Sequence, residues 1–61
     1  MNAKHDLAEA LCQLLETKTL EKITVKDIVA WCGVNRQTFY YHFNDVYDLM
    51  RWIFDREAAA L

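Results

Sequence analysis

The chain contains little that interrupts or crosslinks a polypeptide. Proline is absent and glycine occurs once, at position 33, among 61 residues. Because 54% of the residues are hydrophobic and no segment is rich in proline or glycine, the sequence excludes a long linker or a disordered tail. A chain this short buries only about 60% of the surface that its unfolded form exposes. We therefore expect one small domain that depends on a dense hydrophobic core.

Several chemically active groups are missing or isolated. The two cysteines, Cys12 and Cys32, have neither the CxxC nor the histidine spacing of a zinc site, and they make a poor disulfide framework. We expect both thiols to pack as small apolar groups on helix faces. Serine is absent, and neither cysteine has a partnered histidine. We therefore expect no enzyme: no catalytic residue, no metal site and no cofactor.

Long apolar runs are also missing. No stretch reaches the roughly 20 apolar residues of a membrane-spanning helix. The first residues lack the charged and then apolar layout of a signal peptide. We expect a cytoplasmic protein without a membrane partner.

The chain has no overall positive charge, although such a charge is usual in nucleic-acid-binding domains. Its net charge is -2. The charges are unevenly distributed, however. Residues 18–43 carry four cationic and two acidic side chains, whereas residues 44–61 carry two cationic and four acidic ones. The middle of the chain is therefore the part that suits an acidic partner.

That middle part, from Thr24 to Phe43, has the pattern of two short helices joined by a tight turn. Thr24 and Asp27 have a spacing close to that of a capping box at a helix start. Apolar residues then recur at the intervals of one buried helical face. Gly33 follows where a helix end needs a left-handed residue, and Asn35 is a good cap for a second helix. Two helices connected in this way form a helix-turn-helix.

The second helix of the pair, residues 36–42, has an unusual surface. Phe39 and Phe43 are four residues apart and are expected to face inward together. The other positions lack a carboxylate and are expected to face largely outward: Arg36, Gln37, Thr38, Tyr40, Tyr41 and His42. Arginine and glutamine pair with guanine and adenine edges, while threonine, tyrosine and histidine suit phosphate oxygens. The alternative is an ordinary helix with half-buried tyrosines and a solvated arginine, but the preceding turn favours a DNA recognition helix.

Helical patterns flank this pair on both sides. Residues 3–17 carry a leucine stripe typical of a helix buried along one side, and residues 18–23 are expected to form a connector. A fourth helix, residues 46–61, is apolar on more than one side and ends without a glycine or proline terminator. We therefore expect the natural chain to be longer. The sequence leaves open whether Trp31 is core or surface.

These residues resemble the N-terminal DNA-binding domain of the TetR family of bacterial transcriptional regulators. The resemblance covers nearly the whole chain and rests on Thr24-Val25, Asp27-Ile28, Gly33-Val34 and Thr38-Phe39-Tyr40-Tyr41-His42-Phe43, followed by Leu49. Residues 40–49 are also similar to regulators of dihydroxyacetone-kinase operons. The expected fold is all-α: a homeodomain-like three-helix helix-turn-helix bundle plus the start of a fourth connecting helix. The four helices are expected at about 3–17, 25–32, 36–42 and 46–61.

The resemblance also implies sequence-specific binding of duplex DNA, with helix 36–42 in the major groove. The implied base-reading residues are Arg36 and Gln37. The implied contacts that mostly reach phosphate are Thr38, Tyr40, Tyr41 and His42, with Thr24 and Lys26 at the start of the preceding helix. One position departs from the family pattern, because Val46 replaces a lysine that clamps a phosphate. Asp45 can still cap the fourth helix, but we expect that clamp to be lost.

The implied partners are double-stranded DNA with a palindromic operator and a second copy of the protein. Homodimer formation and any small-molecule effector would require a C-terminal domain beyond these 61 residues. A repressor is the commoner outcome in such a family, although activation occurs. The competing hypothesis is a small protein-protein interaction module that uses the apolar surface of the fourth helix around Trp52 and Phe54.

Overall fold

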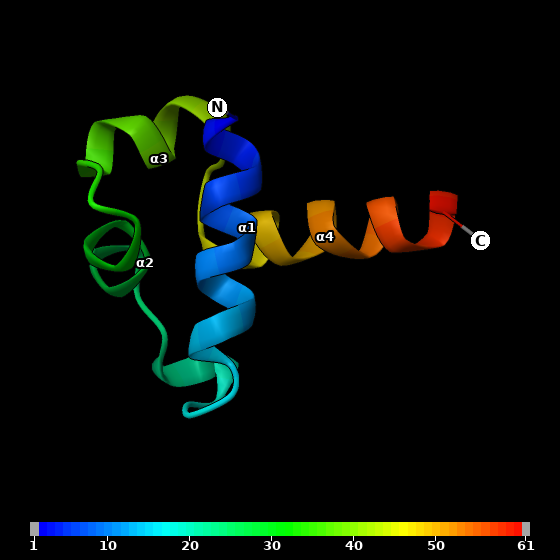
Figure 1. The fold of residues 1–61 in the computed structure, drawn as a ribbon, viewed down its shortest axis with the longest axis horizontal. Coiled ribbons are helices and arrows are strands. Elements are labelled where there is room, and N and C mark those ends of the chain that lie inside the picture. Colours follow the sequence, from blue (N-terminus) through cyan, green and yellow to red (C-terminus); the bar gives the residue numbers. More distant parts are fainter. Residues whose placement is uncertain (1, 61) are drawn as a thin grey trace.

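The chain is helical throughout most of the part that the computed structural model describes, which is residues 2–60, with side chains described for residues 2–56. The elements are α1 (Ala3–Leu14), the short 3₁₀ helix η1 (Leu20–Lys22), α2 (Val25–Cys32), α3 (Arg36–His42) and α4 (Val46–Ala60). Residues 2–60 contain no strand. Figure 1 shows α1 at the centre, with α2 and α3 on one side and α4 leaving on the other. The expected all-α fold is confirmed.

The ends of α2 and α3 agree with the prediction, whereas α1 is shorter than predicted. It ends at Leu14 instead of near Thr17, because the N–H groups of Glu16 and Thr17 donate to carbonyls three residues back and tighten the chain into a turn. Within the predicted connector, residues 20–22 form one 3₁₀ turn. The predicted extension of α4 to Leu61 lies outside the described residues. None of the described helices is long and apolar enough to span a membrane.

The core lies around α1, which contacts α2, α3 and α4. Its largest fully buried side chains are Phe39, Leu7, Leu11, Ile28 and Leu49. Phe39 and Phe43 are both buried, with ring centroids 5.8 Å apart, so the predicted inward-facing pair is confirmed. Val46 is buried as well. Val46, at the position where the resemblance implied a lysine, therefore forms part of the core of this domain.

The cysteines do not behave alike. Cys12 is exposed, so the prediction that it packs as a buried apolar group is wrong. Cys32 is half-buried, and its thiol donates to the carbonyl oxygen of Asp6 at 3.3 Å. Burial, with smaller contributions from the carboxylates of Asp6 and Glu9, raises the pKa of the Cys32 thiol. The position that the sequence left open, Trp31, is 50% exposed.

The turn between α2 and α3 depends on the backbone conformation of Gly33. This residue has a φ of 77° and a ψ of 27°, in the left-handed region. Its N–H and that of Val34 both donate to the carbonyl of Val29, which closes the end of α2. A Cβ atom at position 33 would meet no other atom within 4 Å. Glycine is therefore required by its dihedral angles and not by lack of space.

The start of α2 carries a complete capping box. The Thr24 hydroxyl oxygen accepts from the Asp27 N–H at 3.1 Å, and Asp27 Oδ2 accepts from the Thr24 N–H at 3.0 Å. Lys18 Nζ donates to the same Asp27 oxygen at 3.4 Å. The backbone hydrogen bond from Thr24 is the main cause that lowers the pKa of Asp27, and Lys18 adds a smaller contribution.

Gly33→Ala tests the left-handed conformation of the turn between α2 and α3. The substitution should destabilise the domain by about 1–2 kcal/mol, the usual cost of a left-handed conformation for a residue with a side chain. Gly33→Asn should cost less, because asparagine tolerates this conformation better. Urea unfolding followed by circular dichroism measures both variants. A Gly33→Ala protein as stable as the wild type would contradict the assignment.

The capping box predicts a pH dependence of stability. Because folding lowers the pKa of Asp27, the ionised carboxylate contributes stability that is fully present above the unfolded aspartate pKa of about 3.9. That contribution is lost as the pH falls through the lower folded pKa. Asp27→Asn should therefore be less stable than the wild type at neutral pH and should approach it in acid. Thermal unfolding across this range measures the difference, and a gap that stays constant would refute the prediction.

Candidate nucleic-acid interface

The fold holds α3 from one side and leaves its other side in solvent. Phe39 lies on the inner side of the helix, and Phe43 follows at its C-terminal cap. The ring of Trp52, from α4, packs against Phe43 with centroids 5.8 Å apart and the planes tilted by 64°. Figure 1 shows α3 at the edge of the molecule, crossing the end of α1. The position of α3 is therefore fixed from behind.

Most of the side chains predicted to bind DNA lie on the solvent side of α3. Arg36 and Gln37, in its first turn, are exposed. Tyr40 and Tyr41 are 55% and 81% exposed, so neither tyrosine is the half-buried packing residue of the alternative interpretation. His42 is half-buried, and its ring meets that of Tyr41 edge to face at 5.0 Å. The helix thus presents an arginine, an amide and two phenols together.

Thr38 has a local function that the sequence did not indicate. Asn35 Oδ1 accepts a hydrogen bond from the Thr38 N–H at 2.9 Å and another from the Thr38 hydroxyl at 3.1 Å. A hydroxyl has one hydrogen to donate, and that of Thr38 is engaged in the N-terminal cap of α3. The cap therefore competes with the predicted phosphate contact of Thr38.

The start of α2 also offers groups that suit phosphate. Thr24 and Lys26 are both exposed. The Thr24 hydroxyl accepts from the Asp27 N–H, which leaves its own hydrogen available for donation. The N–H groups of Val25 and Lys26 lie in the first turn, where helical geometry provides no backbone partner. One hydroxyl, two amides and one ammonium group are therefore grouped in this turn.

The start of α4 has the opposite charge. Asp45 Oδ1 accepts from the Asp48 N–H at 2.8 Å, so the predicted Asp45 cap is confirmed. Asp48 Oδ2 accepts in turn from the Asn44 N–H at 3.0 Å. Val46, which lies between these two residues in the sequence, is buried. The two carboxylates cap backbone N–H groups at this end of α4, and no cationic side chain accompanies them. This end of α4 therefore adds no positive charge to the predicted interface.

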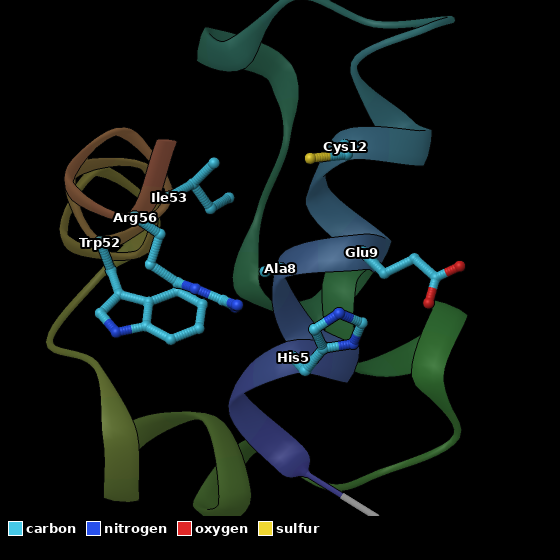
Figure 2. A pocket seen from close by; sticks show the side chains of 7 residues that line it. All are labelled: His5, Ala8, Glu9, Cys12, Trp52, Ile53 and Arg56. Atoms are coloured by element: carbon cyan, nitrogen blue, oxygen red, sulfur yellow. The ribbon is translucent and has the colours of Figure 1, made fainter. Parts of the chain in front are cut away.

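A groove of about 370 Å³ lies between α1 and α4, and no residue of α2 or α3 lines it (Figure 2). Its lining consists of His5, Ala8, Glu9, Cys12, Trp52, Ile53 and Arg56. The guanidinium of Arg56 lies 4.8 Å from the centroid of the Trp52 ring, and Lys4 Nζ lies 5.8 Å from it. Trp52, which the interaction-module hypothesis used as a docking residue, is therefore engaged by its own chain. The exposed aromatic residues of α4 are Tyr47 and Phe54.

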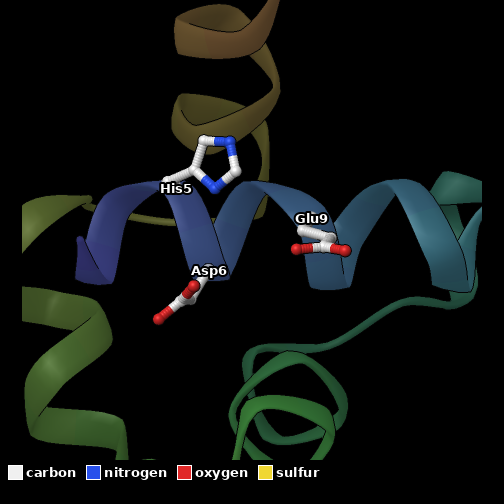
Figure 3. Close-up of side chains that lie close together, drawn as sticks. All are labelled: His5, Asp6 and Glu9. Carbon is white, nitrogen blue, oxygen red and sulfur yellow. The ribbon is translucent and has the colours of Figure 1, made fainter. Parts of the chain in front are cut away.

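Three titratable groups gather on α1. The potential ligand atoms of His5, Asp6 and Glu9 lie within 4.8 Å of one another. Figure 3 shows the imidazole of His5 and the carboxylate of Asp6 leaving the helix in opposite directions. Side chains that diverge from one exposed helix do not form the closed, supported shell of a structural metal site. His5 and Glu9 are exposed and Asp6 is half-buried.

Comparison with known proteins gives consistent matches. Residues 7–51 match the family described as bacterial regulatory proteins, tetR family. The chain is 34% identical over 55 residues to the HTH-type dhaKLM operon transcriptional activator DhaS of Lactococcus lactis subsp. lactis (strain IL1403), over 90% of this chain and 29% of that protein. A solved structure of the dihydroxyacetone kinase operon activator DhaS matches with a TM-score of 0.86 and 31% identity, over 90% of this chain and 31% of that one.

The chain thus spans less than a third of these relatives. The family match nevertheless includes the whole helix-turn-helix and every residue predicted to bind DNA. The matched proteins are named as regulators, and the structural match extends over nearly all of the chain. The chain therefore belongs to the tetR family of bacterial regulatory proteins, as a helix-turn-helix DNA-binding domain of a transcriptional regulator.

Proposed function

We propose that residues 1–61 form one DNA-binding domain that inserts α3 into the major groove of duplex DNA. The observation that carries the proposal is the solvent side of α3, which is polar, free of carboxylates and held rigidly from behind by Phe39 and Phe43. A recognition helix enters the groove with its N-terminal residues toward the base edges. Arg36 and Gln37 occupy those positions, and their side chains suit guanine and adenine.

The phosphates on either side of the groove are contacted by two groups of residues in this proposal. Tyr40, Tyr41 and His42 meet one strand from the later part of α3. Thr24 and Lys26 meet the other from the start of α2, where the free amides of the first turn also favour an anion. Thr38 acts mainly through its hydrogen bonds to Asn35, which hold the first turn of α3 in place.

The same proposal extends to the regulator that contains this domain. It acts in the bacterial cytoplasm as a homodimer on a palindromic operator, with the two α3 helices roughly 34–36 Å apart, or a multiple of that distance. Dimerisation and effector binding belong to a further domain, for which the greater length of the relatives leaves room. Because the named relatives are activators of a dihydroxyacetone kinase operon, we assign the regulator to operon activation, although the family resemblance alone favoured a repressor.

A second candidate function uses α4. Tyr47 and Phe54 are 60% and 65% exposed on this helix, which is the property expected of a protein-docking surface. Partner binding at this surface would depend on Phe54 and would vary little with salt. DNA binding would fall steeply with salt, since it releases counterions from phosphates. The two functions are compatible, because they use different helices.

Arg36→Ala tests base reading. Loss of a bidentate guanine contact should weaken binding to the preferred operator by about 1–3 kcal/mol and relax the preference at one base pair. Fluorescence anisotropy with a duplex selected from a random pool, and with its single-base variants, measures both effects. Arg56→Ala removes an arginine from α4 and serves as the control. Equal losses in the two variants would show that Arg36 contributes only charge.

Lys26→Ala and Tyr41→Phe test the phosphate contacts. Lys26→Ala should weaken binding to all duplexes alike and reduce the slope of log affinity against log salt by about one, because one fewer cation displaces counterions. Tyr41→Phe should weaken binding without changing the slope, since it removes a neutral hydroxyl. Anisotropy titrations at several salt concentrations measure the slopes. An unchanged slope for Lys26→Ala would exclude this lysine from the interface.

A further inference from the structure

The start of α2 combines groups that favour phosphate with one that repels it. The Thr24 hydroxyl, the Lys26 ammonium and the two free amides of the first turn favour an anion. Asp27 lies in the same turn and is only partly buried. Its carboxylate stabilises the helix start through the capping box, but an ionised group at this place repels an approaching phosphate. A positive charge beside Asp27 would offset this repulsion.

Lys18 supplies that charge from a different part of the chain. It lies in the turn that follows α1, and its Nζ is 3.4 Å from Asp27 Oδ2. The same oxygen accepts the Thr24 N–H at 3.0 Å. The ammonium group is thus paired with the same oxygen that caps the helix. The side chains of Lys18 and Asp27 are 42% and 30% exposed, so the pair is partly open to solvent beside the start of α2.

Stability alone is a weak explanation for this pair. Ion pairs exposed to solvent stabilise folded proteins little, because water and salt screen them and both side chains lose freedom. Asp27 is already held by the Thr24 N–H, and its own amide is satisfied by the Thr24 hydroxyl. Removing Lys18 leaves the capping box intact. The main effect of the lysine is therefore on the charge that the start of α2 presents to its surroundings.

We propose that Lys18 is a positioning residue of the DNA interface, which neutralises Asp27 so that a phosphate can approach Thr24 and Lys26. Lys18 acts through Asp27 and does not itself bind the phosphate. The inference rests on the proposed function, since it concerns the strength of the same α2 contact. It adds a residue outside the helix-turn-helix to the groups that determine affinity.

The test compares the wild type with Lys18→Met, Asp27→Asn and the variant that combines the two substitutions. Methionine keeps most of the length of the side chain without its charge, and asparagine keeps an oxygen that can accept the Thr24 N–H. Lys18→Met leaves Asp27 uncompensated and should weaken duplex binding on the order of threefold to tenfold at low salt, with a smaller loss as salt screens the charge. Circular dichroism establishes that each variant is folded.

The double variant gives the decisive comparison. Lys18→Met with Asp27→Asn restores the neutral charge of the pair and should recover wild-type affinity. The matched control combines Lys18→Met with Glu9→Gln. It has the same total charge as the double variant, but Glu9 lies on α1 and acts on Cys32 at the opposite end of α2. This control should remain as weak as Lys18→Met alone.

Two results overturn the inference without touching the proposed function. Lys18→Met could bind duplex as tightly as the wild type at low salt, which would mean that Asp27 needs no compensation. Alternatively, the double variant could stay as weak as Lys18→Met, which would mean that Lys18 contacts phosphate directly. Failure of the wild type to bind any duplex is a different outcome, because it rejects the DNA-binding proposal and this inference with it.

Discussion

The burial of Phe39 and Phe43 is the constraint on which the rest of this structure depends. A seven-residue helix such as α3 is too short to be stable in water by itself, so it exists only because the bundle packs against it. Phe39 is 0% and Phe43 4% exposed. Deleting a buried phenylalanine ring typically costs about 3–5 kcal/mol, a large part of the stability of a small domain. The same packing that forms α3 also determines which of its side chains face solvent.

The positions of the charged side chains matter more in this domain than its net charge. The acidic residues at the start of α4, Asp45 and Asp48, cap backbone amides, while Asp27 does so at the start of α2 and is paired with a lysine. These three carboxylates thus have local structural functions, and the solvent side of α3 carries no carboxylate. A net charge of -2 is therefore compatible with an anionic partner.

The sequence predicted best those structural features that depend on residues close to one another along the chain. The bounds of α2 and α3 agree with the prediction, because Thr24, Gly33 and Asn35 fix them by local hydrogen bonds and dihedral angles. α1 was predicted too long, since the leucine stripe continues past the point where the turn begins. Cys12 was misplaced because its exposure depends on the angle at which α4 leaves the bundle, and periodicity within α1 carries no information about that angle.

In the predicted interface too, the sequence indicated what depends on one helix and not what depends on side-chain contacts. The outward direction of Arg36, Gln37 and Tyr41 follows from the inward direction of the two phenylalanines, so the helical period predicted it. The hydrogen bond from the Thr38 hydroxyl to Asn35 and the pairing of Lys18 with Asp27 were not predicted. Each depends on a side-chain rotamer or on the path of a turn, and several such arrangements fit the same sequence pattern.

The cap of α3 has an evolutionary consequence. Asn35 and Thr38 hold the first turn between them, and the two side chains inside that turn, Arg36 and Gln37, are exposed. Mutations at positions 36 and 37 are thus almost free of folding penalties. Under the proposed function, the target sequence of this domain can therefore change through two exposed positions while the packing that forms the bundle stays the same.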